Sequence, residues 1–146
     1  MKIALASDHA GFGLKKEITA WLKEQSYQIL DFGAFSEESV DYPDYAFPAS
    51  EAVAGGIADL GILVCGSGTG MSITANKVTG IRAANCLTPD MAKLAREHNN
   101  ANILCLGSRL VTFEEAKGII LEFLENEFQG GRHMIRVEKI HALTGW

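Results

Sequence analysis

A cysteine followed by alternating glycines is the part of this sequence best suited to chemistry. The loop joins an apolar run to a segment of small residues and reads Cys65-Gly66-Ser67-Gly68-Thr69-Gly70. The backbone amides of such a loop can converge on an anion, and the start of a following helix adds positive potential. The glycines lack the GxGxxG spacing of a dinucleotide-binding loop, and no Gly-Lys-Ser/Thr follows as in a P-loop. The loop predicts an anion cradle, the alternative being a tight turn that only packs a strand against a helix.

Cys65 stands at the first position of this loop, beside the predicted helix start, where a thiolate is favoured over a thiol. A thiolate there can take a proton from carbon. The alternative is a small buried hydrophobe, which is the better interpretation of Cys86 and Cys105 in their apolar runs. The adjacent glycines favour the chemical role for Cys65, because removing a proton next to a carbonyl builds an enediolate whose charge needs preorganised donors.

His98 is a second candidate for acid–base chemistry. It lies with Asn99 at the end of a predicted helix, and an imidazole can exchange a proton near neutral pH. Taken alone, the residue is better explained as a cation at a helix C-terminus, with Asn99 or Asn100 as the cap. Its chemical role therefore depends on which groups the fold brings next to it.

The other histidines carry weaker signals. His9 follows Asp8 directly after the first predicted strand and could simply cap the helix that comes next. His133 and His141 lack close partners of the metal-ligand type, and no cysteine and histidine pattern has zinc-finger spacing. The sequence therefore predicts no metal site.

Arg132 and Arg136 are spaced four residues apart, so on a helix their guanidinium groups project from one face. A solvated basic face is the usual explanation of such a pair. A phosphate dianion is another reason to keep two cations together, because each guanidinium can bind phosphate oxygens through two hydrogen bonds. Arg109, which follows the fifth predicted strand, can join them.

The composition favours one compact α/β domain spanning residues 1–146. A chain of 146 residues, 47% apolar, is long enough for one sizeable core and too short for two ordinary domains. The net charge of −5 and the lack of a basic run argue against nucleic-acid and membrane partners. No signal peptide is recognisable, no apolar segment approaches ~18 residues, and the three cysteines form no CxxC pair. We therefore expect a cytoplasmic protein with reduced thiols.

Strand and helix patterns alternate along the chain. Short apolar or β-branched runs at 2–7, 28–32, 60–65, 81–87 and 103–106 predict five strands, separated by segments with helical periodicity. Pro43, Pro48 and Pro89 lie at or near predicted helix starts, where a missing amide donor costs least. The break at 129–131 precedes a last helix over 132–143 that can reach beyond the main body. The pattern predicts a Rossmann-like, three-layer α/β fold with a parallel five-stranded sheet, helices on both faces and a protruding C-terminal helix.

Ligands of a parallel α/β sheet bind outside the carboxyl ends of its strands, especially where the strand order reverses. The residues at those ends are Ser7-Asp8-His9 after the first strand, the loop 65–70 after the third, and Gly107-Ser108-Arg109 after the fifth. The candidate residues of the sequence therefore gather at one edge of the predicted sheet.

Together these residues resemble a known family, ribose-5-phosphate isomerase type B, which also includes galactose-6-phosphate and allose-6-phosphate isomerases. The resemblance covers nearly the whole chain. Its motifs are Ser7-Asp8-His9-Ala10-Gly11, Asp41-Tyr42-Pro43, Cys65-Gly66-Ser67-Gly68-Thr69-Gly70, Asn76-Lys77, His98-Asn99, Gly107-Ser108-Arg109, Gly130-Gly131-Arg132-His133 and Arg136. The resemblance implies a Rossmann-like homodimer, often paired into a tetramer, whose active sites use residues from both subunits and need no metal or organic cofactor.

The resemblance also implies roles for individual residues. Cys65 is expected to move a proton between C1 and C2 of the sugar, and His98 to open the sugar ring. Ser67, where some members have threonine, keeps a hydroxyl that can assist ring opening. The residues expected to bind substrate are Asp8, His9, Gly66, Ser67, Gly68, Thr69, Gly70, Asn99, Arg109, Arg132 and Arg136.

The predicted reaction is aldose–ketose isomerisation of a sugar phosphate through a cis-enediolate. Ribose 5-phosphate and ribulose 5-phosphate, of the pentose phosphate pathway, are the expected pair, and a four-carbon or six-carbon sugar phosphate is the alternative. A second hypothesis is a non-catalytic domain that binds a phosphorylated ligand, in which Cys65 is only packed; the presence of Cys65, Ser67 and His98 together argues against it. A third, a thiol redox sensor, needs a resolving cysteine close to Cys65, and none is near in sequence.

Overall fold

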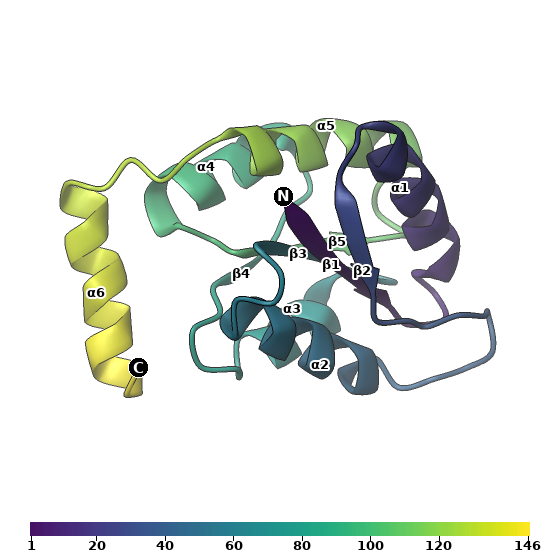
Figure 1. Cartoon of the computed structure of the whole chain (residues 1–146), viewed down its shortest axis with the longest axis horizontal. Helices are drawn as coiled ribbons and strands as arrows, with labels where there is room; N and C mark the ends of the chain where they lie inside the picture. The colour runs from purple at the N-terminus through teal and green to yellow at the C-terminus, as the bar shows by residue number, and fades with distance from the viewer.

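A five-stranded, all-parallel sheet forms the centre of the computed structural model, which describes residues 1–146 (Figure 1). The strands are β1 Lys2–Ser7, β2 Gln28–Asp31, β3 Leu60–Cys65, β4 Ala83–Asn85 and β5 Ile103–Gly107, in the spatial order β2-β1-β3-β5-β4. The three central strands are almost entirely buried, which explains why the sequence shows them as continuous apolar runs instead of alternating patterns. The predicted fold class is confirmed.

Helices cover both faces of the sheet. They are α1 Phe12–Glu24, α2 Pro43–Ala54, α3 Thr69–Ala75, α4 Pro89–Asn99, α5 Phe113–Glu125 and α6 Arg132–Thr144. Helices α1, α4 and α5 share one apolar core with the sheet, and α2 and α3 share a second core on the opposite face. Figure 1 shows the same three layers, with α6 outside them.

Helix α6 lies at one end of the molecule, next to α4 and away from the sheet (Figure 1). The segment between α5, which ends at Glu125, and α6 contains Gly130 and Gly131, whose φ angles of +65° and +58° favour glycine. The protruding C-terminal helix predicted from this break is therefore present. No helix of the chain is long and apolar enough to cross a membrane.

Two local predictions were wrong. Pro48 lies inside α2 and not at a helix start. The helix continues through it because Ala46, Ala49 and Val53 pack into the core on both sides of the proline. Strand β4 is shorter than the predicted range 81–87, since it is an edge strand with β5 as its one neighbour.

The strand order reverses between β1 and β3. The chain leaves β1 toward β2 on one side of the sheet and later enters β3 on the other side of β1. Loops that leave the carboxyl ends of two such strands separate and open a crevice, which is the usual ligand site of an open parallel sheet. The crevice here lies between the loop that starts at Asp8 and the loop that starts at Cys65.

Candidate active site

A pocket of about 380 Å³ opens at the carboxyl ends of β1 and β3. Its lining residues are Asp8, His9, Ala10, Tyr42, Cys65, Gly66, Ser67, Gly70, Arg109 and Leu110. The candidate residues that follow the first, third and fifth strands therefore meet in one place, as predicted from the strand ends. Gly68 and Thr69 belong to the same loop without lining the pocket.

Cys65 is the last residue of β3, and its sulfur accepts a hydrogen bond from a backbone amide of its own loop. The N–H of Gly68 donates to Cys65 Sγ at 3.2 Å. This turn requires glycine, because Gly68 has φ +77° and a Cβ there would collide with the side chain of Asn85. The sulfur is therefore held at the pocket by the backbone of its own loop.

Two hydrogen bonds hold Ser67, one to its side-chain oxygen and one to its backbone carbonyl, and its side chain is exposed. The N–H of Thr69 donates to Ser67 Oγ at 3.3 Å, and Asn85 Nδ2 donates to the Ser67 carbonyl at 3.1 Å. Because the hydroxyl oxygen accepts in the first contact, its hydrogen stays free to donate to a ligand. Asn85, at the end of β4, was missed by the sequence analysis because nothing in its surroundings marks it as a loop contact.

Asp8 and His9 have different local partners. Asp8 Oδ1 accepts a hydrogen bond from the Gly11 N–H at 2.9 Å, so the carboxylate supports the turn that leads into α1. His9 Nδ1 lies 3.2 Å from the backbone nitrogen and the carbonyl oxygen of Val40. One ring nitrogen of His9 is thus held by the backbone, while the residue lines the pocket.

Arg109 and Tyr42 close the pocket over two of the glycines. A Cβ on Gly66 would stand 3.0 Å from Arg109 Nη1, and one on Gly70 would stand 2.7 Å from the Tyr42 ring. The absence of a side chain at both glycines therefore lets Arg109 and Tyr42 approach the loop closely. Tyr42 was not among the predicted site residues, although its position directly before Pro43 in one of the motifs was a usable signal.

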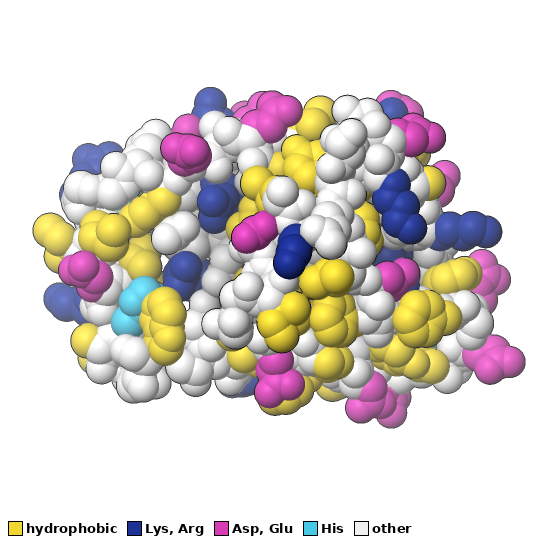
Figure 2. All heavy atoms as spheres, in the orientation of Figure 1, with side chains coloured by type: hydrophobic (Ala, Val, Ile, Leu, Met, Phe, Trp, Pro, Cys, Tyr) yellow, Lys and Arg dark blue, Asp and Glu magenta, His cyan; other side chains and the backbone are white.

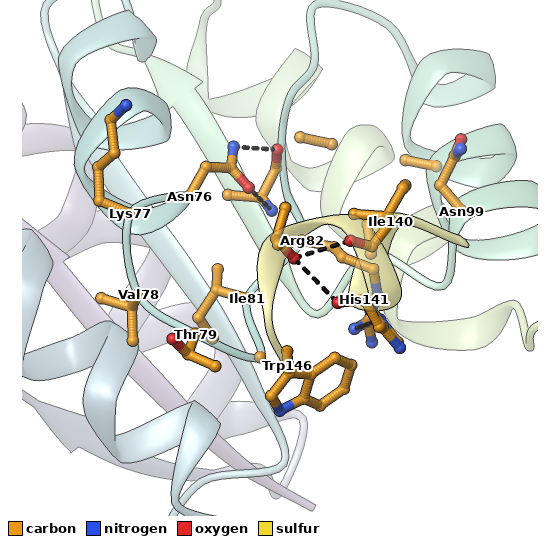
Figure 3. Close-up of a pocket in the computed structure, with 16 residues that line it drawn as sticks. Asn76, Lys77, Val78, Thr79, Ile81, Arg82, Asn99, Ile140, His141 and Trp146 are labelled. Carbon is orange, nitrogen blue, oxygen red and sulfur yellow. Dashed lines mark hydrogen bonds between the residues drawn. The ribbon is translucent and has the colours of Figure 1, made fainter. Parts of the chain in front are cut away.

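Besides Gly68 and Thr69, which belong to the Cys65 loop, four predicted site residues do not line this pocket. His98, in the last turn of α4, stacks on His133, with 4.2 Å between the ring centroids and 8° between the ring planes. Arg132 and Arg136 lie on the exposed surface of α6. Asn99 lines a different and larger cavity (Figure 3). Within one chain the candidate residues therefore form two groups, one around Cys65 and one where α4 meets α6.

The larger cavity has a volume of about 560 Å³ and lies between α6, the end of α4 and residues 76–84. Arg82 Nη1 lies 3.2 Å from His141 Nε2, and the Arg82 guanidinium lies 5.5 Å from the Trp146 ring. Figure 3 shows these three side chains together at one end of the cavity. None of the residues around Cys65 lines this cavity.

The local surroundings change the pKa of several groups near both sites. Burial raises the pKa of Cys86 to about 11, and burial followed by the neighbouring thiols raises that of Cys105 well above its usual range. Burial, followed by the charges of His98, Arg132 and Arg136, lowers the pKa of His133. No three Cys, His, Asp or Glu side chains come together as a metal-binding group.

The chain is similar to sugar-phosphate isomerases over almost its full length. Residues 3–140 match the sequence model described as Ribose/Galactose Isomerase. The ribose-5-phosphate isomerase B of Escherichia coli (strain K12) is 51% identical over 142 residues, which cover 97% of this chain and 95% of that protein.

Solved structures of ribose-5-phosphate isomerase B proteins have the same fold as this chain. The ribose-5-phosphate isomerase B of Clostridium thermocellum superimposes with a TM-score of 0.98 at 52% identity, covering 99% of this chain and 98% of the other. That of Mycoplasma genitalium, with bound ribulose-5-phosphate, superimposes with a TM-score of 0.94 at 44% identity, covering 99% and 96%. The sequence match over residues 3–140 and the shared fold show that the chain belongs to the ribose/galactose isomerase family.

Proposed function

We propose that this chain interconverts ribose 5-phosphate and ribulose 5-phosphate. The observation that carries the proposal is the Cys65 sulfur, held by the Gly68 amide in a pocket that also contains Arg109 and His9. Such a pocket offers a base for carbon and cations for a phosphate in one place. The relatives named ribose-5-phosphate isomerase B, one of them solved with ribulose-5-phosphate, support this substrate pair.

Ring opening is the first step. The cyclic sugar opens when a proton leaves the anomeric hydroxyl and another reaches the ring oxygen. His98 acts as the acid of this step and Ser67 assists it, because the Ser67 hydroxyl keeps a free hydrogen and an imidazole exchanges protons near neutral pH. The product is the open-chain aldose with its carbonyl at C1.

Isomerisation follows at Cys65. The thiolate removes the proton from C2, the electron pair forms the C1–C2 double bond, and the negative charge moves onto O1 of the cis-enediolate. Amides of the loop 66–70 stabilise this charge. The proton returns to C1 while the hydroxyl proton of O2 leaves and O1 is protonated, which gives the ketose with its carbonyl at C2. Atoms and electrons balance without an external oxidant or reductant.

The phosphate is bound away from the reacting carbons. Arg109 and His9 lie in the Cys65 pocket, and Arg132 and Arg136 present two further guanidinium groups four residues apart on α6. Charge-assisted hydrogen bonds to the phosphate fix one end of the sugar, so that C1 and C2 lie against the sulfur. Asp8 and Asn99 are assigned to the sugar hydroxyls, which carboxylate and amide groups bind well.

We propose that a homodimer, alone or paired into a tetramer, completes each site. Cys65 of one chain then works with His98, Asn99, Arg132 and Arg136 of its partner, since these four residues do not line the Cys65 pocket of their own chain. Helix α6 also has large apolar side chains that one chain leaves in water, among them Ile135 at 67% exposure and Leu143 at 80%. Figure 2 shows apolar side chains along the α6 end of this face. Such a surface is typical of an interface between subunits.

The remaining proposals concern the chain as a whole. Residues 1–146 act as one sugar-phosphate isomerase domain, supported by a single sheet whose two faces both carry packed helices. The protein acts in the cytoplasm, a reducing compartment that suits its three free cysteines. Its net charge of −5 supports a small-molecule partner and no nucleic acid or membrane.

The experiment that tests the function is a survey of aldose phosphates of four, five and six carbons for ketose formation. Ribose 5-phosphate is expected to react with the highest kcat/KM, and unphosphorylated ribose is expected to react poorly. A clear preference for a four-carbon or six-carbon sugar phosphate would change the proposed substrate but leave the proposed reaction, aldose–ketose isomerisation, unchanged. Binding of phosphorylated sugars without any ketose formation would instead indicate a non-catalytic binding domain.

A further inference from the structure

The rings of His98 and His133 stack face to face at the junction of two helices. His98 lies in the last turn of α4 and His133 in the first turn of α6, and their centroids are 4.2 Å apart with only 8° between the planes. His133 is 7% exposed, whereas its neighbours Arg132 and Met134 are exposed to solvent. The first turn of α6 therefore turns one histidine inward, onto the ring of His98.

No hydrogen bond or ion pair within the chain fixes the ring of His98. Neither ring nitrogen makes a hydrogen bond within the chain, whereas histidines that exchange protons are usually oriented by a hydrogen bond to one nitrogen. A stacked neighbour fixes the plane of an imidazole through its face. Both nitrogens, which lie at the ring edge, then remain available to a ligand.

The surroundings of His133 favour the uncharged form of its ring. Burial, followed by the positive neighbours His98, Arg132 and Arg136, lowers its pKa. Neither of the chain's two ion pairs involves His133. An uncharged ring can remain stacked on His98 whether His98 is imidazole or imidazolium, while a charged one would repel the protonated form.

We propose that His133 is a positioning residue for His98, which holds the imidazole plane for ring opening without exchanging a proton itself. The inference rests on the proposed function, because it assigns His98 to the ring-opening step. It requires a flat, uncharged ring at position 133, and it does not require imidazole chemistry there. Phenylalanine should therefore replace His133, and alanine should not.

The kinetic test compares His133→Ala and His133→Phe on two substrates. Ribose 5-phosphate must be opened, whereas a four-carbon aldose 4-phosphate cannot close a five-membered ring because the hydroxyl it would need carries the phosphate. We expect His133→Ala to lower kcat on ribose 5-phosphate about tenfold, with KM little changed, since misplacing a catalytic group costs rate more than binding. Activity on the four-carbon substrate should stay within about twofold, and His133→Phe should restore kcat to within about threefold.

A second readout does not depend on activity. In NMR spectra of histidine-labelled protein, the ring protons of His98 should lie upfield in the parent and in His133→Phe, because both place an aromatic ring face over them. His133→Ala should remove this shift. His141→Ala is the matched control: His141 is also a histidine of α6 with its ring against an aromatic neighbour, Trp146, and it does not touch His98. It should leave both the His98 signals and the kinetics unchanged.

Three results would overturn the inference. An unshifted His98 ring in the parent would mean that the rings do not stack in solution. Equal losses for His133→Phe and His133→Ala would mean that the imidazole itself is needed. Equal losses on both substrates would assign His133 to phosphate binding or to stability. The variant His98→Asn distinguishes a failure of this inference from a failure of the proposed function. If His98→Asn loses activity equally on ribose 5-phosphate and on the four-carbon substrate, His98 does not act in ring opening, and the proposed function itself is wrong on this point.

Discussion

The backbone N–H of Gly68 points at the sulfur of Cys65, with 3.2 Å between the nitrogen and Sγ. The two residues lie three positions apart, and the contact exists because Gly68 adopts a φ of +77° that other residues avoid. The contact is the structural reason to treat Cys65 as a base.

Replacing Cys65 with alanine is expected to abolish isomerisation while the fold and the affinity for phosphorylated sugars persist. The substitution removes a base and only one sulfur atom from the packing, and loss of a general base costs at least ~10² in rate. Steady-state kinetics with ribose 5-phosphate and calorimetric titration of a non-reacting sugar phosphate measure the two effects. Cys105→Ala is the control, since Cys105 is a buried thiol of the same core that does not line the pocket. Activity of Cys65→Ala within a few-fold of the parent would refute the assignment.

The three thiols should also differ in their reaction with iodoacetamide. A raised thiol pKa means less thiolate at any pH below it, so with a pKa of about 11 only about one Cys86 molecule in a thousand is thiolate at pH 8. Cys105 is fully buried as well. We expect labelling at Cys65 first, slowed by a bound sugar phosphate, with Cys86 reacting only as the pH rises toward 11. Peptide mass spectrometry reads out each site, and preferential labelling of Cys86 at pH 8 would contradict this order.

The sheet and the grouping of residues around Cys65 could be predicted from the sequence, for two physical reasons. Buried parallel strands appear as continuous apolar runs, and their carboxyl ends meet at one edge of the sheet, so the placement of Asp8, Cys65 and Arg109 follows from strand order alone. Pro48 was misplaced because a proline suggests a helix start locally, while core packing on both sides of it carries the helix onward. At such positions tertiary packing overrides the local conformational preference of the residue.

Contacts between distant segments were beyond reach of the sequence. The stacking of His133 on His98 depends on how α6 packs against α4, and the segment that joins α6 to the body has no periodicity that would fix its direction. Asn85 meets the glycine loop only because β4 and β3 both neighbour β5. A pattern read along the chain reports which face of an element is apolar, and it does not report which element will cover that face.

The arginine pair of α6 is expected to discriminate phosphorylated from unphosphorylated sugars. Arg132→Ala and Arg136→Ala should each raise KM for ribose 5-phosphate about tenfold or more, because each removes charge-assisted hydrogen bonds to the phosphate. KM for unphosphorylated ribose should barely change. Lys139→Ala is the matched control, a cation of the same helix with no assigned role. If both arginine variants keep the full preference for the phosphorylated sugar, the pair is only a solvated basic face.

The shared site can be tested by mixing two inactive variants. Cys65→Ala and His98→Asn homodimers should each lack one required group in both sites, whereas a mixed dimer has one site with both groups intact and one with neither, because a twofold interface exchanges residues reciprocally. Random re-association of equal amounts makes half of the dimers mixed, so about a quarter of the parent activity should return. Native mass spectrometry of one isotope-labelled variant counts the mixed dimers, and each variant refolded alone is the control. Mixed dimers that form in the expected proportion and stay inactive would place Cys65 and His98 in the site of the same chain.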